Sequence, residues 1–304
     1  PPHSCACYIE AKIAGFYALA PDASSTEASV PPLSPAELPG PAFDAAGAGA
    51  AAADPADWPT YRHDPARSGT SASSVPTALA PLWEAKLGGK LTSPVVVGDV
   101  LCVASSDTHT VHALTLREGA PLWGFTAEGR IDSPPTFAAG RALFGSADGH
   151  VYCLRASDGQ LVWRFRAAPD DRRIVSEGQL ESAWPVCGSV LVDGGVVYCA
   201  AGRSSYLDGG IRLCRIDLAT GRLLRDRILW SRDPVTGDQP DEPIMFEMAG
   251  ALPDVLSTDG EHLFMRQLTF DARTLEDQPV VAHLYSPAGF LNGDWWHRTY
   301  WLHG

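Results

Sequence analysis

The sequence has few basic side chains and no long apolar run. It carries 23 Lys and Arg residues against 36 Asp and Glu residues, and no segment concentrates the positive charge. A surface that follows nucleic-acid phosphates requires such a concentration, so nucleic acid is excluded as an expected partner. No stretch approaches the roughly 18 consecutive apolar residues of a membrane-spanning helix. We therefore expect no transmembrane segment.

The motifs of the commonest enzyme classes are also absent. The sequence contains no GxSxG nucleophile elbow, no GxxxxGK[ST] phosphate loop and no HExxH zinc motif. These patterns supply the nucleophile, the phosphate cradle or the metal ligands of their enzymes, so the residues do not support those chemistries. We predict no catalytic residue.

The seven cysteines form no pair of CxxC clusters, and a closed zinc site is therefore not predicted. Five of them lie in strand-like contexts such as VLCVA and VYCLR, where we interpret them as small core residues. Cys5 and Cys7 stand apart, near His3. We interpret them as a structural pair in a truncated module, and a soft metal site or disulfides to other residues are the alternatives. No metal ligand is predicted.

Glycine and proline are abundant, with 29 and 25 residues in a chain of 304. This excess favours many short elements joined by turns over a helical bundle. The chain opens on Pro1 and Pro2, without an initiator methionine or a signal sequence, and we expect a processed product or a fragment. Residues 1–20 are interpreted as the tail of a preceding module. Residues 21–56, rich in Pro, Ala and Gly, are predicted to be a disordered linker.

Internal repeats follow the linker. Trp83, Trp123 and Trp163 are spaced by 40 residues, and the pairs Ser93-Pro94 and Ser133-Pro134 keep the same spacing. Runs of β-branched, aromatic and small residues alternate with turn residues, which indicates about four strands per repeat.

Two further copies are less regular. The third has Arg225 where the spacing requires a tryptophan, and the fourth keeps an Asp-Gly turn and an alternating strand, Leu263 to Gln267. The repeats are predicted near residues 82–127, 131–166, 183–230 and 249–276.

Period, strand content and tryptophan position predict an all-β fold, a β-propeller of four-stranded blades with repeats of about 40 residues. One tryptophan per blade would fill the wedge between neighbouring sheets. About four blades are recognisable. Because a propeller needs closure to remove its open edges, we expect an incomplete ring in this chain.

One turn of each repeat resembles the motif A-x-D-x-x-T-G-x-x-x-W of propellers with pyrroloquinoline quinone (PQQ) repeats. Three copies keep the motif in part: Ala113, Thr115, Glu118, Gly119 and Trp123; Cys153, Arg155, Asp158, Gly159 and Trp163; Asp217, Thr220 and Gly221. Residues 57–69 are similar to the lead-in before the first blade of this PQQ-like family. The resemblance covers residues 57–276 and implies the propeller fold.

The resemblance leaves two activities open. The family includes quinoprotein dehydrogenases, which hold PQQ and calcium over the propeller face, and cofactor-free members such as the outer-membrane protein assembly factor. The dehydrogenases stack two adjacent cysteines on the quinone, and this chain has no Cys-Cys. The spacing of Asp254, Asn292 and Asp294 does not indicate a shared calcium site. We predict no cofactor, and PQQ with calcium is the alternative.

Two segments are candidates for binding a ligand or partner. The insert between the second and third copies, residues 170–184, contains Arg172 and Arg173, and inserted loops often carry binding residues. A solvated loop is the alternative. The stretch near the end of the sequence gathers aromatic and basic side chains that suit a sugar platform or an interface anchor, and a blade strand is the alternative. Its candidate residues are Trp295, Trp296, His297 and Arg298.

From repeats without a catalytic set, we predict a non-catalytic propeller that acts as a protein-interaction scaffold or recognition module. The resemblance implies a bacterial cell envelope, periplasmic or extracellular, and a protein or envelope component as partner. A quinone-dependent dehydrogenase or degenerate relative, and a carbohydrate-binding propeller, are the alternatives. The polar residues of the lead-in are predicted to form a cap tied by salt bridges, or alternatively a funnel mouth: Arg62, His63, Asp64 and Arg67.

Overall fold

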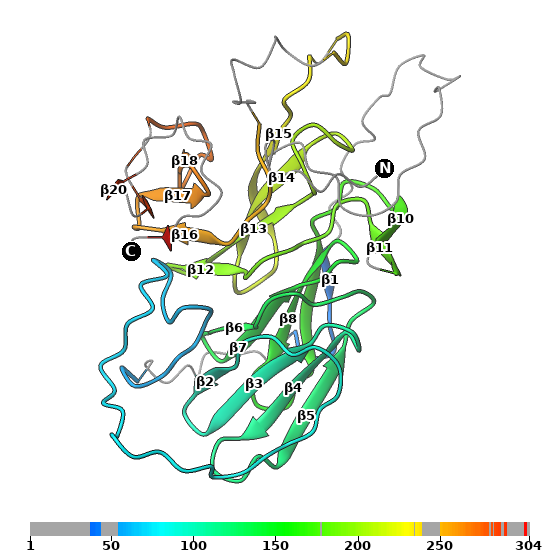
Figure 1. Cartoon of the computed structure of the whole chain (residues 1–304). Helices are drawn as coiled ribbons and strands as arrows, with labels where there is room; N and C mark the ends of the chain where they lie inside the picture. The colour runs from blue at the N-terminus through cyan, green and yellow to red at the C-terminus, as the bar shows by residue number, and fades with distance from the viewer. Residues whose placement is uncertain are drawn as a thin grey trace.

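The computed structural model consists of strands and turns arranged as small antiparallel sheets (Figure 1). It describes residues 37–43, 54–176, 178–233, 235–238, 250–279, 281, 283–286, 289–290 and 301–302. These residues contain no helix, and so no helix that could cross a membrane. The prediction of an all-β propeller fold is confirmed for this part of the chain.

Three sheets are four-stranded blades, and in each the consecutive strands are neighbours. The first blade comprises β2 (Val95–Val97), β3 (Val100–Ser105), β4 (Thr110–Thr115) and β5 (Pro121–Thr126). The second comprises β6 (Thr136–Ala138), β7 (Arg141–Gly145), β8 (His150–Arg155) and β9 (Leu161–Arg166). The third comprises β12 (Leu191–Asp193), β13 (Val196–Ala201), β14 (Ile211–Asp217) and β15 (Leu223–Leu229).

The fourth repeat is a smaller sheet of β16 (Leu256–Thr258), β17 (His262–Met265) and β18 (Leu268–Asp271). The sequence predicted one strand from Leu263 to Gln267, but β17 ends at Met265. Arg266 has a φ of 52° and turns the chain into β18. Another small sheet has the order β20 (Gly289–Phe290), β19 (Leu284–Ser286) and β21 (Trp301–Leu302).

A recurrent turn joins the last two strands of each blade. In the first three blades the N–H of a glycine at positive φ donates to the carbonyl four residues earlier: Gly119 to Thr115, Gly159 to Arg155 and Gly221 to Asp217. In the third blade the Asp217 carboxylate accepts hydrogen bonds from the Thr220 N–H (2.8 Å) and hydroxyl (2.6 Å). The fourth repeat keeps the turn with Leu275, whose φ is 61°. The D-x-x-T-G pattern therefore favours this turn, because glycine accepts a positive φ without strain and the Asp carboxylate binds the turn.

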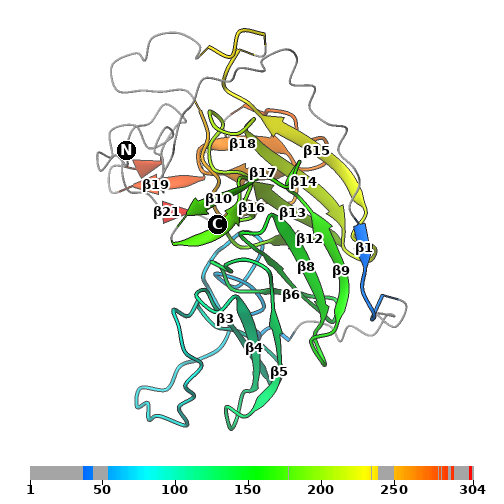
Figure 2. The same cartoon turned by 90° about the vertical axis from the view of Figure 1, so that its right-hand side faces the viewer.

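Part of the predicted linker is structured. Strand β1 (Glu37–Pro39) pairs antiparallel with the outer strand β9, and the views in Figures 1 and 2 show it at the edge of the second blade. Ala42 is buried, and Gly40 lies so close to Leu161 that a Cβ would stand 2.1 Å from the Leu161 carbonyl oxygen. The prediction of disorder over residues 21–56 is wrong for 37–43, because β9 offers an open edge and Gly40 allows close approach.

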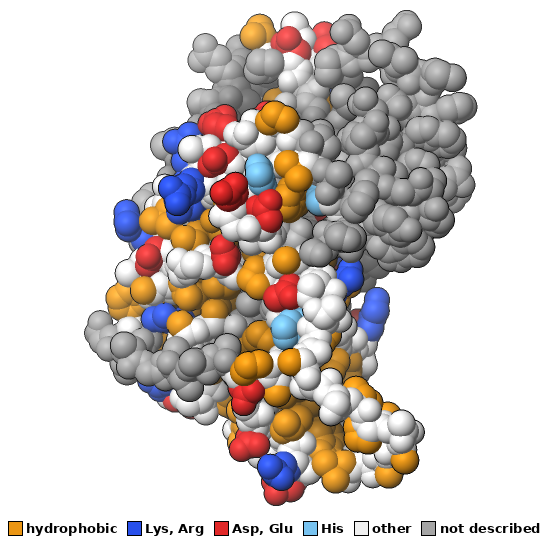
Figure 3. All heavy atoms as spheres, turned by 90° about the vertical axis from the view of Figure 1, so that its left-hand side faces the viewer, with side chains coloured by type: hydrophobic (Ala, Val, Ile, Leu, Met, Phe, Trp, Pro, Cys, Tyr) orange, Lys and Arg blue, Asp and Glu red, His pale blue; other side chains and the backbone are white. Residues whose placement is uncertain are grey.

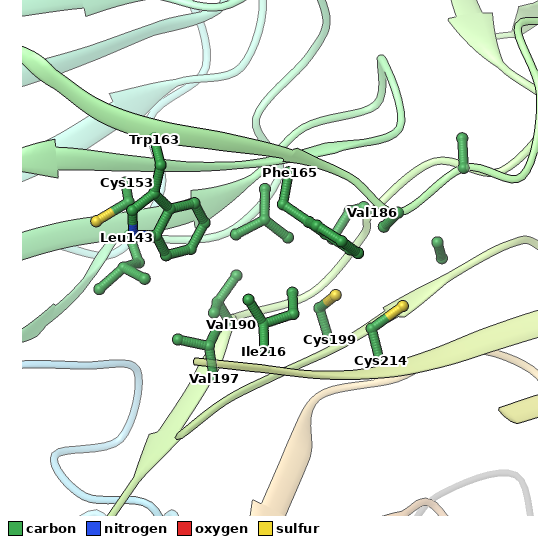
Figure 4. Packing of buried hydrophobic residues seen from close by; sticks show 14 of the residues in the cluster. Leu143, Cys153, Trp163, Phe165, Val186, Val190, Val197, Cys199, Cys214 and Ile216 are labelled. Atoms are coloured by element: carbon green, nitrogen blue, oxygen red, sulfur yellow. The ribbon is translucent and has the colours of Figure 1, made fainter. Parts of the chain in front are cut away.

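The hydrophobic cores lie between successive blades. Between the second and third blades, Trp163 and Phe165 of β9 pack with Cys199 of β13 and Cys214 and Ile216 of β14 (Figure 4). Similar clusters join the first blade to the second and the third to the fourth. Each sheet is thus stabilised by its neighbours, as in other repeat architectures.

Residues 57–69, the predicted lead-in, form a segment that we call the strap because it ties together the first strands of three repeats. The ties are a bridge from Trp58 to Val96 of β2, an N–H of Phe137 in β6 donating to Pro59 (2.7 Å), and an N–H of Thr258 in β16 donating to Pro65 (3.1 Å). The described blades do not close into a ring (Figure 1). The expectation of an incomplete propeller is confirmed for the described residues.

Candidate interaction surface

The tryptophans and glycines of the repeat motif meet across the blade boundaries. The ring of Trp123 covers Gly159, and the ring of Trp163 covers Gly221, so that a Cβ at either glycine would lie 2.5 to 2.7 Å from a ring carbon. Trp83 covers Gly119 in the same manner. Each indole N–H also donates to a carbonyl three residues before the covered glycine, at Leu116 (2.9 Å), Ala156 (2.9 Å) and Leu218 (3.1 Å). The tryptophans and glycines of the predicted repeat motif therefore have a structural role, which is to join each repeat to the next.

The joint between the third and fourth repeats has polar contacts beside its hydrophobic cluster, in place of a tryptophan. Tyr198 of β13 donates its hydroxyl to the carbonyl of Ala272 (3.0 Å), three residues before Leu275. This carbonyl is equivalent to the one that accepts from an indole in the earlier repeats, so the tyrosine hydroxyl takes the place of the indole N–H. Arg225, identified from the spacing as the replacement for a tryptophan, lies 3.3 Å from Glu276. Arg227 donates to the carbonyl of Leu275 (2.8 Å) and pairs with Asp277. The sequence located Arg225 but gave no signal for Tyr198, which comes from a different strand.

The insert between the second and third blades is a two-stranded hairpin, β10 (Arg173–Ser176) paired with β11 (Gln179–Ser182). Val175 and Leu180 stand directly opposite each other, and their relative exposures are 61% and 59%. Ser176 and Glu181 belong to the other face and are buried. The hairpin therefore presents a pair of apolar side chains to solvent on one face and rests on the blades through the other.

Polar contacts hold this hairpin on the first and second blades. Arg130 donates to both Asp132 (2.7 Å) and the buried Glu181 of β11. His109 Nε2 lies 2.7 Å from Gln179 Oε1 near the hairpin tip. The N–H of Ser182 donates to the carbonyl of Ala147 (2.8 Å). These contacts fix the hairpin at both ends.

The structure places the two predicted binding arginines at the base of the hairpin. The Arg172 guanidinium stacks on Trp184, 4.8 Å from the ring centroid, and pairs with Asp208 (2.9 Å), which Arg203 also contacts. Arg172 is thus engaged in supporting the hairpin. Arg173 shares the outer face with Val175, and among the described residues its one ion pair is a distant contact of 3.9 Å with Glu128, so its charge remains accessible to a partner.

A buried polar cluster, which the sequence did not reveal, lies beside the hairpin in the turn between β7 and β8. The Tyr152 hydroxyl donates to Asp148 (2.6 Å), and His150 Nδ1 lies 3.2 Å from the same carboxylate. Burial raises the pKa of Asp148, but the hydrogen bonds from His150 and Tyr152 outweigh burial and hold that pKa below its usual value. The only sequence signal was the Asp-Gly turn. The cluster stiffens the surface on which the hairpin rests.

The polar residues of the strap do not act as one salt-bridged cap. His63 and Asp64 form a pair at 3.3 Å, and Asp64 also accepts from Ser68. Arg67 instead is fully buried and donates to neutral oxygens: Leu256 carbonyl (3.0 Å), Thr60 hydroxyl (2.7 Å) and Tyr61 carbonyl (2.9 Å). Burial lowers its pKa to about 10, which leaves it charged at neutral pH. Arg67 therefore connects the strap to the fourth repeat.

The remaining predicted binding residues lie outside the described part of the chain: Trp295, Trp296, His297 and Arg298. Charged side chains are mixed on the surface that can be seen. Figure 3 shows Asp and Glu interspersed with Lys and Arg and with hydrophobic side chains on one face. That face offers no concentrated positive charge of the kind a phosphate backbone requires.

Comparison with known proteins agrees with this architecture. Residues 66–184 match a PQQ-repeat family model described as outer membrane protein assembly factor BamB. These residues are therefore similar to PQQ-like repeats, and the predicted resemblance is confirmed for residues 66–184. No curated protein sequence matches this chain.

Several solved structures resemble this chain in fold. The quinohemoprotein alcohol dehydrogenase ADHIIG from Pseudomonas putida HK5 has a TM-score of 0.59 and 17% identity, covering 80% of this chain and 42% of that one. The quinohemoprotein alcohol dehydrogenase from Comamonas testosteroni has a TM-score of 0.55 and 17% identity, covering 73% and 40%. BamB from Moraxella catarrhalis has a TM-score of 0.44 and 18% identity, covering 68% and 57%. The chain thus spans less than two thirds of each. At 17% identity, the likeness to the dehydrogenases is evidence for a common fold alone and carries no information about activity.

The described residues form no cluster of side chains suited to calcium. Among them no three His, Cys, Asp or Glu side chains gather closely enough to hold a metal ion. Asp254, one of the three oxygen ligands considered from the sequence, lies 3.9 Å from Arg266, and the other two are outside the described residues. A calcium site needs several convergent oxygen ligands, and the described residues around Asp254 do not supply them.

Proposed function

We propose that this PQQ-like chain is a non-catalytic scaffold of the bacterial cell envelope that binds a protein partner through hairpin β10–β11. The observation that carries the proposal is the exposed Val175–Leu180 pair on a hairpin whose base is fixed. Apolar side chains on a rigid projection provide contact area with little loss of conformational entropy. The family model's description as an outer membrane assembly factor supports an envelope location and a protein partner.

The backbone of the hairpin favours an extended partner segment. Because only two residues separate Ser176 from Gln179, these two form a hydrogen-bonded pair, and the alternate residues direct their N–H and C=O groups away from the hairpin. On β11 the outward N–H of Ser182 is used by the second blade. On β10 the outward groups belong to Arg173 and Val175, and no backbone hydrogen bond to them is found within the described residues.

The partner chemistry follows from these groups. A strand added to β10 would place an apolar side chain against Val175 and Leu180, and an acidic side chain would suit Arg173. The same hairpin would be a poor sugar site, because its exposed face has no aromatic ring. The carbohydrate alternative depends on Trp295, Trp296 and Trp301, whose side chains the structure does not describe.

Site-specific photo-crosslinking in the bacterium that makes the protein tests the proposal. A photoreactive amino acid replaces Val175, Leu180 or, as a control, Val235, which is 90% exposed and lies outside the hairpin. We expect one protein adduct shared by positions 175 and 180 and absent at 235. Leu180→Glu should lower the yield at position 175 about tenfold, as for loss of an interface anchor.

Two outcomes would overturn the scaffold proposal. Equal adducts at positions 175 and 235, or none at either hairpin position, would remove the hairpin as an interface. Oxidation of an alcohol or sugar by the purified protein with added quinone and calcium would instead support the dehydrogenase alternative.

A further inference from the structure

Equivalent positions on the two central strands carry different residue pairs in successive repeats. The second member of each pair lies seven residues before the glycine or leucine of the recurrent turn. The pairs are Val103 opposite His112, Phe144 opposite Tyr152, Cys199 opposite Cys214, and Met265 opposite Leu268. In the second blade the pair is two stacked rings, with centroids 5.2 Å apart. Among the described repeats, the third alone has two thiols here.

The register brings these two cysteines within disulfide range. The N–H of Leu218 donates to the carbonyl of Gly195, and the ladder from this pair to Cys199 and Cys214 advances by four residues. Since hydrogen-bonded pairs alternate along an antiparallel ladder, Cys199 and Cys214 also form such a pair, with Cα atoms about 5.5 Å apart. Disulfides are found at Cα separations of roughly 4.4 to 6.8 Å.

The surroundings of the pair are apolar and closed. Cys199 and Cys214 are 2% and 1% exposed and lie against Phe165 of the second blade, and Figure 4 shows their sulfur atoms side by side. Both thiols are free in the structure. The hydrogen bond with Cys214, together with burial, raises the pKa of Cys199 well above its ordinary value. Because both thiols are buried, exchange requires the chain to fold in the presence of the oxidant or to open to it.

We propose that Cys199 and Cys214 are a reversible two-electron redox site that closes to a cross-strand disulfide. One thiolate attacks a small-molecule disulfide such as oxidised glutathione and releases one glutathione thiolate. The second cysteine then attacks the mixed disulfide and releases the other. Two S–H bonds are lost, one S–S bond forms, and the two electrons and two protons leave as two molecules of reduced glutathione. This site is independent of the hairpin and of the scaffold proposal.

The disulfide would tie β13 to β14, the two central strands of the third blade. In an oxidising compartment the blade would carry this covalent link, and in a reducing one it would not. The link would stabilise the third blade, which contacts the fourth repeat without a tryptophan of the repeat motif.

Refolding in glutathione buffers tests the proposal. The full chain is denatured, reduced, and refolded at a series of ratios of oxidised to reduced glutathione, and free thiols are then trapped by alkylation and mapped by peptide mass spectrometry. We expect a peptide linked through Cys199 and Cys214 to rise to a plateau as the ratio increases. Cys102 and Cys153, which are equally buried but have no cysteine opposite them, should remain alkylated at every ratio.

The controls separate this pair from general oxidation. Cys214→Ala should abolish the internal link of Cys199, whereas Cys153→Ala should leave the link unchanged. If the wild-type chain regains its native circular dichroism and both cysteines are alkylated at the most oxidising ratio, the proposal is wrong. A link from either cysteine to a different cysteine would also overturn it, and the wild-type map alone decides this should a variant fail to fold.

Discussion

At the residue scale, a glycine at positive φ determines where a tryptophan can dock. Trp123 and Trp163 each cover a glycine of the next repeat, at Gly159 and Gly221, where any side chain would collide with the indole. In the fourth repeat Leu275 takes the same backbone conformation, and none of the described indole hydrogen bonds is made to this turn. An indole can therefore dock only on a turn that carries glycine. The fourth repeat lacks the turn glycine, which explains why it is faint in the sequence.

Gly159→Ala tests this pairing. The added Cβ would lie 2.5 Å from the ring of Trp123 at a φ of +70°, so we expect a loss of about 2 to 4 kcal/mol in the free energy of unfolding, measured by urea denaturation. Gly140→Ala is the matched control, because Gly140 has a φ of +71° and no atom within 4 Å of its Cβ position. It should lose only about 1 kcal/mol. If the two substitutions lowered the free energy of unfolding equally, packing of Gly159 against the Trp123 ring would contribute nothing to stability.

At the element scale, the strap and the hairpin act in opposite ways. The strap places a buried arginine among carbonyl oxygens and so connects repeats that are far apart in the sequence. The hairpin is held on the blades by one face and exposes apolar side chains to solvent on the other. Both depend on arginines whose planar guanidinium groups satisfy several acceptors at once.

Arg67→Lys tests the strap. A lysine keeps the charge but cannot reach the oxygens of Leu256, Thr60 and Tyr61 together, and a buried acceptor left without its donor costs about 1 to 3 kcal/mol. We expect a loss of roughly 2 to 4 kcal/mol in unfolding free energy. Arg117→Lys, at a side chain that is 82% exposed, should change it by less than about 0.5 kcal/mol. Comparable effects of the two substitutions would contradict the role of Arg67.

At the scale of the whole molecule, the joints between repeats differ in kind. Tryptophan fills the joints from the first blade to the second and from the second to the third. The joint from the third blade to the fourth repeat also has a hydrophobic cluster, but in place of a tryptophan it adds ion pairs of Arg225 and Arg227 with Glu276 and Asp277, all of them at least partly exposed. Salt screens exposed charges and has little effect on buried apolar contacts, so the joints should respond differently to ionic strength.

Hydrogen exchange measured by mass spectrometry tests this difference. Raising NaCl from about 0.05 M to about 0.5 M should increase amide exchange in β16–β18 and leave β6–β9 nearly unchanged. Arg227→Met should remove most of this salt dependence. If amide exchange in all the blades responded equally to salt, the ion pairs between the third blade and the fourth repeat would not determine the stability of that joint.

Most of the repeat framework was predictable, and most of the interaction surface was not. The spacing of Trp83, Trp123 and Trp163 located the first blades because one side chain must fill each wedge between sheets. The insert was located too, but its sequence did not show that Arg172 would stack on Trp184 while Val175 and Leu180 faced solvent. Those facts depend on the register of the hairpin and on Glu181 being drawn inward by Arg130, a residue 51 positions away.

The sequence by itself determined the all-β class, the 40-residue period and the recurrent turn, because these depend on local backbone preferences and on a side chain repeated at fixed spacing. Tertiary structure alone decided the rest. It paired residues 37–39 of the predicted linker with β9, buried Arg67 between the strap and the fourth repeat, and placed Cys199 opposite Cys214. Each of these depends on which groups from distant segments face one another, and a period or a local preference carries no information about that.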